Sequence, residues 1–255
     1  MNIIGIIPAR YNSSRFPGKP LVKINGISMI ERVYNQATKT KFLKKVIVAT
    51  DDERISTHVT NFGGIAIMTS TNVKNGTERC YIALKILQEL SPNLNYDVII
   101  NIQGDEPFIQ PSEIDTLAKC FIDDNNTQIA TLIKEISNEK DLFNPSIIKV
   151  ITDINNFAIY FSRSPIPFIR DTHKNEWLKQ YKFMKHIGIY AFKKEILENV
   201  TKLTPSSLEK AESLEQLRWI ENGYKIKTNI AKHESFSIDT PEDLKKVEKI
   251  FSKKN

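Results

Sequence analysis

The chain has 255 residues, and 40% of them are hydrophobic, which is enough to bury one sizeable core or one core with a small appended lobe. No run approaches the roughly 18 consecutive apolar residues of a membrane span, and the apolar start lacks the basic region and cleavage site of a signal peptide. The net charge of +6 comes mostly from scattered lysines. Because no basic stripe alternates with aromatic residues, we expect neither a nucleic-acid nor a membrane partner.

The first half alternates short apolar runs with segments of helical period. Strands are predicted at Ile3–Ile7, Lys45–Thr50, Ile65–Met68 and Asp97–Gln103. Helices are predicted at Ser28–Thr40, Asp52–Phe62 and Thr77–Leu90. The runs IIGII and VIINI are apolar at nearly every position, which suits strands covered on both faces. The first half is therefore predicted to be a three-layer α/β unit with a parallel sheet flanked by helices.

The second half has a mixed pattern. Strands, some of them antiparallel, are predicted at Gln128–Ile136, Ile147–Thr152, Ala158–Ser162, His186–Phe192 and Tyr224–Ala231. A long helix is predicted over Ser206–Asn222 with Gly223 following its end, and a last helix begins at Thr240-Pro241. The polar stretch His173–Lys182 is predicted to be a mobile loop. Cys80 and Cys120 lack metal-ligand spacing and suit a reducing compartment.

A cluster of cations follows the first predicted strand. The segment from Ile7 to Pro20 contains Arg10, Arg15 and Lys19 together with hydroxyls and a glycine. Open α/β sheets bind ligands at the carboxyl ends of their strands, and Arg, Lys and loop amides are ordinary phosphate ligands. The segment is not a Walker A loop, because proline follows Gly18-Lys19 and the earlier glycine is missing. A triphosphate cradle is therefore predicted, with a solvated basic loop as the alternative.

Two acidic segments could complete such a site. Asp105 and Glu106 follow the buried run VIINI directly, and Asp105, the nearer to the strand, is the better candidate ligand for Mg²⁺. Asp239 stands before the last predicted helix and could meet the same metal. The structural alternatives are a turn held by local hydrogen bonds for Asp105 and support of the helix cap for Asp239.

Several weaker signals have good structural explanations. The run Asn75–Arg79 could contact a nucleotide, although helix capping explains it nearly as well. Asp51-Asp52-Glu53 invites comparison with the D-x-D metal motif of glycosyltransferases, but a helix needs acids at its start. His186 is more often a structural residue than a catalyst in such a setting.

Taken together, the segments resemble those of the 3-deoxy-manno-octulosonate cytidylyltransferases, or CMP-Kdo synthetases. The resemblance runs in order through almost the whole chain, in IIPARYNSSRFPGKPL, VIVATDDERI, NGTER, VIINIQGDEP, FNPSIIKV, AIYFSRSPIP, KHIGIYAF, LEKAESLEQLR and IDTPEDL. It implies one α/β nucleotidyltransferase domain over 1–255, with a mostly parallel sheet and a smaller mixed lobe. Residues 1–127 would bind nucleotide, 128–238 would bind the sugar and dimerise, and 239–255 would return to the core as a helix.

The resemblance also implies a reaction and roles for individual residues. CTP and the acidic sugar Kdo would give CMP-Kdo and pyrophosphate, with Mg²⁺ as cofactor, in a cytoplasmic homodimer that serves lipopolysaccharide synthesis. The triphosphate would contact Arg10, Arg15 and Lys19. The cytosine and ribose would contact Pro8, Ala9, Thr77 and Gln103. The metal would be held by Asp105, which also meets the sugar, and by Asp239. The sugar acid would be held by Arg163, His186, Tyr190, Glu215 and Gln216.

One departure and three alternatives remain open at this level. Residues 233–237 read HESFS where the family carries glycines, so flexibility of this stretch is not implied. The chain could activate another acidic sugar, such as a sialic acid or an amino-substituted Kdo, by the same chemistry. A GT-A glycosyltransferase would want D-x-D at a strand end, where this chain has Gln-Gly-Asp-Glu-Pro. A regulator that binds CTP without turnover is the third.

Overall fold

The computed structural model describes residues 1–13, 15–234 and 236–252. Ser14 of the predicted cradle, Ser235 of the HESFS stretch and residues 253–255 of the predicted C-terminal segment lie outside the described residues. The chain divides into two compact units: unit 1 is residues 1–118 with the segment from 233 onward, and unit 2 is residues 119–232. Within the described ranges, no helix combines the length and apolar character needed to cross a bilayer.

Unit 1 is built on four parallel strands in the order β6-β1-β4-β5. Their bounds are β1 Ile3–Ala9, β4 Leu43–Thr50, β5 Ala66–Met68 and β6 Val98–Asn101. Gly5 of β1 lies opposite Val46 on one side and Ile100 on the other. The residues of β6 are all buried, as the uninterrupted apolar run predicted.

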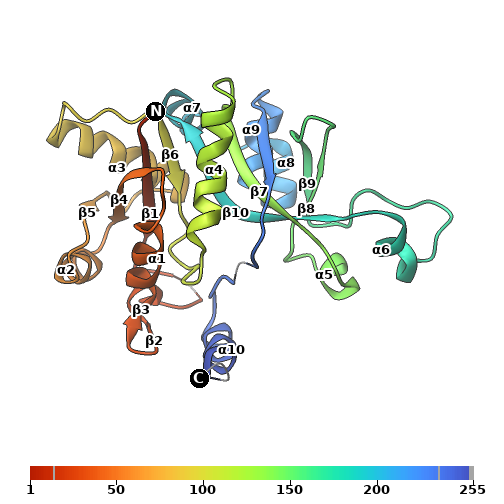
Figure 1. Cartoon of the computed structure of the whole chain (residues 1–255), viewed down its shortest axis with the longest axis horizontal. Helices are drawn as coiled ribbons and strands as arrows, with labels where there is room; N and C mark the ends of the chain where they lie inside the picture. Colours follow the sequence, from red (N-terminus) through yellow and green to blue (C-terminus); the bar gives the residue numbers. More distant parts are fainter. Residues whose placement is uncertain (14, 235, 253–255) are drawn as a thin grey trace. The chain divides into compact units, whose positions relative to one another are not determined.

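Helices α1 Met29–Ala37, α2 Glu53–Asn61 and α3 Gly76–Leu90 pack against this sheet (Figure 1). Helices α4 Pro111–Asp123, which continues past residue 118, and α10 Pro241–Ser252 also begin in unit 1. A short hairpin of β2 Lys23–Ile24 and β3 Ile27–Ser28 precedes α1. The predicted strands and helices of this half are confirmed with shifts of a few residues at their ends. Helix α4 was not predicted, although its apolar residues recur at Ile114, Leu117, Ala118 and Phe121.

Unit 2 contains a mixed sheet, as predicted. Strand β7 Ile129–Glu135 pairs antiparallel with β10 Met184–Lys193 and parallel with β11 Ile226–Ile230. Strand β8 Lys149–Thr152 pairs antiparallel with β10 and with β9 Ala158–Ser162. The α/β fold class with parallel strands and a smaller mixed part is thus confirmed.

The helices of unit 2 correct two predictions. They are α5 Glu139–Phe143, α6 Trp177–Gln180, α7 Lys194–Thr201, α8 Ser207–Glu212 and α9 Glu215–Glu221. The single helix predicted over 206–222 is wrong, because Ser213 adopts a left-handed conformation with φ of 52° and separates α8 from α9. The loop predicted over 173–182 contains α6, whose Trp177 is buried among Phe183, Leu142 and Ile136.

Candidate active site

A cavity of about 360 Å³ lies at the carboxyl end of β1 in unit 1. Most of the residues predicted to bind nucleotide or metal line it, namely Pro8, Ala9, Arg10, Arg15, Lys19, Gln103, Asp105 and Asp239. Thr77 is not among its lining residues but is buried in the first turn of α3, beside Gly76, which does line it. Strands, loops and a helix start that are far apart in sequence therefore supply one cavity, as predicted for an open α/β sheet.

A larger hollow of about 620 Å³ lies near the amino ends of β1 and β4, lined by residues that include Asn2, Lys44 and Tyr96. None of the predicted site residues lines it. Because ligands of open α/β sheets bind at the carboxyl ends of the strands, we place the active site in the smaller cavity.

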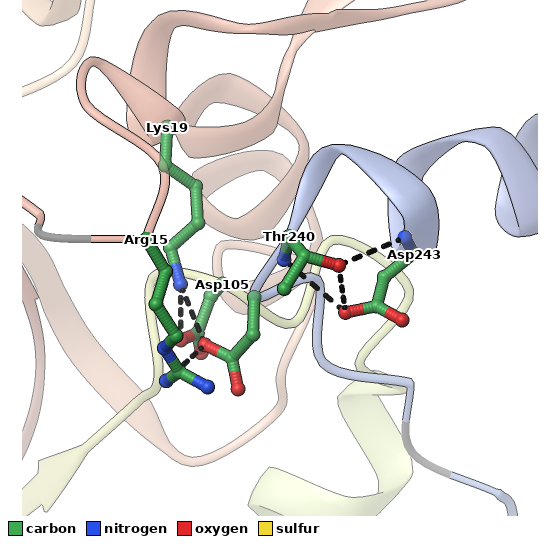
Figure 2. Close-up of polar contacts among 6 residues, drawn as sticks. Arg15, Lys19, Asp105, Thr240 and Asp243 are labelled. Carbon is green, nitrogen blue, oxygen red and sulfur yellow. Dashed lines mark hydrogen bonds and ion pairs between the residues drawn. The ribbon is translucent and has the colours of Figure 1, made fainter.

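Lys19 joins the two predicted metal ligands. Its Nζ lies 2.8 Å from Asp105 Oδ2 and 3.1 Å from Asp239 Oδ1, and its side chain is only 13% exposed (Figure 2). Arg15 Nη2 lies 3.2 Å from the same Asp239 oxygen. Two carboxylates and two cations thus converge from positions as far apart in the chain as Arg15 and Asp239. Such a cluster offers both oxygen ligands for a cation and positive charge for a phosphate.

The turn after β6 presents Asp105 to the cavity. Gly104 allows this, because a Cβ at that position would come within 2.9 Å of the Pro8 carbonyl oxygen. Glu106 is buried, whereas Asp105 is partly exposed, which agrees with the choice of Asp105 as the better ligand. The approach of this turn to β1 therefore requires the glycine of the Gln-Gly-Asp-Glu-Pro run.

Asp239 is brought to Asp105 by the backbone. The Ile238 amide donates to the Asp105 carbonyl at 2.9 Å, and Ile238 is fully buried against Ile24, Met29 and Val247. The cap of α10 is formed instead by its neighbours. Thr240 Oγ1 accepts from the Asp243 amide, while Asp243 Oδ2 accepts from the Thr240 amide and hydroxyl (Figure 2). The alternative that Asp239 serves the helix cap is therefore wrong for its carboxylate, which contacts Lys19 and Arg15.

The run Asn75–Arg79 caps a helix and also contributes to the wall of the cavity. Asn75 caps α3 by accepting from the Glu78 amide at 2.8 Å, as the capping explanation requires. Arg79 is buried, yet it lines the cavity, and its guanidinium donates to Thr69 Oγ1 at 2.6 Å and to Asp51 Oδ2 at 2.8 Å. Sequence reasoning assigned no separate role to Arg79. The structure shows that it is buried and paired with Asp51 just after β4, which makes it a residue of the cavity wall.

The capping explanation of Asp51-Asp52-Glu53 is confirmed for one residue. Asp52 is the N-cap of α2, where its Oδ1 accepts from the Arg54 amide at 3.0 Å. Hydrogen bonds from the Arg54 side chain hold the pKa of Asp52 below its ordinary value. Asp51 has a different task, because it pairs with Arg79. The motif therefore supports the cavity.

In unit 2, His186 and Tyr190 lie together on β10. A bulge at Gly188 and Ile189 interrupts the pairing with β7, and Thr131 Oγ1 donates to the carbonyl of Ile189 at 2.8 Å and lies 2.9 Å from His186 Nε2. Burial lowers the pKa of His186 to about 3 and raises the pKa of Tyr190, to which the charge of Glu215 also contributes. Both side chains are therefore neutral at pH 7.

Tyr190 has an unusual polar group. Its hydroxyl is buried and makes no hydrogen bond of good geometry among the residues the structure describes, although Thr131 lies close enough to act on its pKa. Its ring packs against His186 and Trp219, with ring centroids 5.1 and 5.0 Å apart. A buried hydroxyl without a partner is costly, so a ligand that bonds to it would recover that cost.

The other predicted sugar-binding residues lie in the same unit. The Arg163 guanidinium donates to three backbone carbonyls, those of Glu212 at 2.6 Å, Pro145 at 3.0 Å and Ser213 at 3.4 Å. A guanidinium carries five N–H groups, so these three bonds leave two N–H groups that can bind a ligand. Glu215 is the first residue of α9, and its neighbour Gln216 is buried.

The residues present fit a magnesium site in which the protein and the substrate phosphates each supply part of the ligands. Among the described residues, no group of three His, Cys, Asp or Glu side chains is arranged to hold a metal by itself. Mg²⁺, however, is usually bound by one or two carboxylates together with substrate phosphates. Asp105 and Asp239 supply that number of carboxylates, already turned toward one cationic group.

Comparisons with known proteins agree on one family. The family described as cytidylyltransferase matches residues 4–226. A 3-deoxy-manno-octulosonate cytidylyltransferase of Parabacteroides distasonis is 54% identical over 96% of both chains, and one of Bacteroides thetaiotaomicron is 49% identical over the full length of both.

Solved structures give the same result. A CMP:2-keto-3-deoxy-manno-octonic acid synthetase complexed with CTP superposes with a TM-score of 0.89 at 39% identity, over all of both chains. A cytidylyltransferase from Leptospira borgpetersenii shares the fold at 17% identity, with a TM-score of 0.63 over 99% of this chain and 87% of that one. The chain therefore belongs to the cytidylyltransferase family, among the 3-deoxy-manno-octulosonate cytidylyltransferases.

Proposed function

We propose that this chain transfers CMP from CTP to the anomeric hydroxyl of 3-deoxy-D-manno-octulosonate, releasing CMP-Kdo and pyrophosphate for lipopolysaccharide synthesis. The observation that carries the proposal is the cavity in which Lys19 joins Asp105 and Asp239, at the strand end where this fold binds nucleotides. It agrees with the full-length similarity to a synthetase complexed with CTP and to enzymes named for this reaction.

Within the cavity, the residues divide by chemistry. Arg10, Arg15 and Lys19 would bind the triphosphate, because they bring the positive charge that its oxygens require. Pro8, Ala9 and Gln103 would contact the cytosine and ribose. Thr77, buried in the first turn of α3, would support this part of the cavity wall.

Magnesium is part of this proposal. Asp105 and Asp239 would hold it, and Asp105 would also meet the sugar. When bound, the ion would neutralise phosphate charge and make the attacking hydroxyl more acidic. Arg15 and Lys19 would then be released from their carboxylate partners to contact the triphosphate.

The acidic sugar would be held by groups of unit 2. Arg163 would pair with its carboxylate through the two N–H groups that the three carbonyl bonds leave over. His186 and Tyr190, both neutral, would bond to sugar hydroxyls, and Glu215 and Gln216 would complete the set.

The chemical step is a displacement at phosphorus. The anomeric oxygen attacks the α-phosphorus of CTP, its proton passes to solvent, and the bond from the α-phosphorus to the bridging oxygen breaks as pyrophosphate leaves. Protein groups supply position and charge and form no covalent bond to the substrate. Lys19, Arg10 and Arg15 would stabilise the negative charge on the leaving pyrophosphate.

We also propose a homodimer in the cytoplasm. Unit 2 exposes large apolar side chains near α6, where Phe168 is 73% exposed and Phe143 and Tyr181 are over a third exposed. These rings pack around Trp177 and Phe183 and could be covered by a second copy. Both cysteines are buried free thiols, which suits a reducing compartment. Light scattering of the purified chain would test the dimer.

The proposed reaction is tested by measuring pyrophosphate release with Mg²⁺ and Kdo, comparing CTP with UTP, ATP and GTP. Release with CTP, lost on adding EDTA or omitting Kdo, is the expected result. Activity only with a sialic acid or an amino-Kdo would keep the mechanism and change the substrate. Binding of CTP without release for any acidic sugar would contradict the enzymatic proposal.

A further inference from the structure

Tyr11 organises the loop that carries the cations of the cavity. Its carbonyl accepts from the Ser13 amide at 3.1 Å and from the Gly18 amide at 2.9 Å. Its ring lies against Gly18, where an added Cβ would come within 3.1 Å of Tyr11 Cζ. Gly18 has φ of 71°, a conformation that suits glycine, and directly precedes Lys19. Both the backbone and the ring of Tyr11 therefore help to fix the backbone position from which the Lys19 side chain extends.

The Tyr11 ring is in turn held by α2. The Arg54 guanidinium carbon lies 3.3 Å from the centre of the ring, within the range of a cation–π contact. Asp52 fixes this guanidinium with two hydrogen bonds, from Arg54 Nε at 2.9 Å and from Nη2 at 2.6 Å. Asp52 is itself the N-cap of α2, so the contact is anchored to the start of a helix.

These three residues do not belong to the cavity itself. Among the described residues that line it, Tyr11, Asp52 and Arg54 are absent, whereas Arg10 and Arg15 on either side of Tyr11 are present. A contact effect of Arg54 on a ligand there would therefore be transmitted by the loop. The adjacent Asp51 pairs with Arg79, which does line the cavity. Two consecutive carboxylates after β4 therefore have different partners: Asp51 holds a residue of the cavity wall, and Asp52 holds Arg54 against the loop.

We propose that Asp52, Arg54 and Tyr11 form a positioning contact that presets the cationic loop for the triphosphate of CTP. The inference rests on the proposed function and adds three residues to it that do not touch substrate. Because the loop is held before CTP arrives, less ordering is required on binding, and that gain appears as affinity for CTP.

The test is the dissociation constant for CTP, measured by calorimetry with Mg²⁺ and no sugar. Arg54→Ala is expected to weaken CTP binding about two- to fivefold, the range that an exposed cation–π contact corresponds to. Arg54→Lys, which retains the charge but not the planar group, should fall between that variant and the wild type. The Michaelis constant for the sugar should not change.

Tyr11 provides the second half of the test. Tyr11→Phe retains the ring and should recover most of the CTP affinity that Tyr11→Leu loses. The double variant Tyr11→Leu/Arg54→Ala should bind CTP no more weakly than the worse single variant, because both remove one contact. Lys85→Ala is the matched control, since Lys85 lies over the Tyr81 ring on α3 and neither residue lines the cavity.

Each outcome has a distinct meaning. Unchanged CTP affinity in Arg54→Ala, or additive losses in the double variant, would overturn the inference. Should Tyr11→Leu fail to fold, the comparison of Arg54→Ala with Arg54→Lys decides, because the Arg54 side chain is 57% exposed and its removal leaves the core intact. Failure of the wild-type chain to bind CTP would contradict the proposed function, and this inference with it.

Discussion

The cavity of unit 1 and the His186–Tyr190 cluster of unit 2 are held in opposite ways. In the cavity, charged groups hold one another: Lys19 bonds to two carboxylates, and Asp239 is about a third exposed. In the cluster, aromatic rings and burial hold His186 and Tyr190 neutral, with Thr131 as the polar partner of His186. The charged side chains of the cavity can exchange one ionic partner for another, whereas the packed rings of the cluster keep their positions.

This difference matches the chemistry proposed for each region. A triphosphate and a metal ion bring charges that can replace the ion pairs of Lys19, so the free protein keeps these groups paired until the ligand arrives. A sugar brings mainly hydroxyls, and a rigid neutral surface with an unpaired hydroxyl can bond to them without rearranging. Substitutions should therefore affect catalysis in the cavity, and both stability and sugar binding in the cluster.

The largest effect is expected for the carboxylates of the cavity. Asp105→Asn and Asp239→Asn should each reduce turnover about a thousandfold, since each removes a charge proposed to hold Mg²⁺ at the reacting phosphate. Pyrophosphate release across a Mg²⁺ titration measures the loss, and thermal unfolding checks that the fold persists. A variant with the wild-type rate at limiting Mg²⁺ would show that its carboxylate does not hold the metal.

Lys19→Met is expected to have the next largest effect, about a hundredfold in kcat/KM for CTP. It removes the charge proposed for the leaving pyrophosphate, and it leaves Asp105 and Asp239 without the ammonium that lies between them. Lys194→Met, on α7 of unit 2, serves as a control for loss of a lysine outside the cavity. Equal losses for UTP and CTP would agree with a phosphate role, whereas a loss confined to CTP would place Lys19 at the base.

Tyr190→Phe should separate stability from binding in the cluster. Removing a buried hydroxyl that has no protein partner should leave the free energy of unfolding unchanged or raise it by about 1 kcal/mol. The Michaelis constant for the sugar should rise about tenfold, because one hydrogen bond is lost. Chemical denaturation and steady-state kinetics measure the two quantities, and a destabilised variant with normal sugar kinetics would assign the hydroxyl a structural role.

The sequence predicted the residues that line the cavity better than the contacts that hold those residues in place. Arg10 and Asp105 follow predicted strands within a few residues, and Lys19 lies in the loop that begins at Arg10; strand ends of a parallel sheet share an edge, so their meeting could be expected. The Ile238 amide that bonds to Asp105, and the Arg54 group that rests on Tyr11, join segments far apart in the chain. No local pattern encodes such contacts, which depend on how the completed fold brings loops together.

The errors in unit 2 have a similar origin. The apolar spacing of residues 206–222 continues through Ser213, so periodicity alone gives one helix. In the structure, Glu212 accepts hydrogen bonds from the Ser162 hydroxyl and the Arg163 amide, and the chain turns at Ser213. A tertiary contact at the end of α8 thus accompanies the break that local propensity did not show.

The smallest effect at neutral pH is expected for His186, and it should grow as the pH falls. The folded pKa is lowered to about 3 from 6.5, so between these values the unfolded chain binds a proton that the folded chain does not. Stability should therefore fall by about 1.4 kcal/mol for each pH unit below 6.5, and the full penalty is reached near pH 3. Urea unfolding at pH 7 and pH 5 should show the wild type losing about 2 kcal/mol more than His186→Gln. The control is His173→Gln, which removes a histidine at an exposed site outside the cluster. Equal pH dependence in the wild type and His186→Gln would mean that the folded protein accepts the proton, and His186 could then share with Arg163 the charge of the sugar acid.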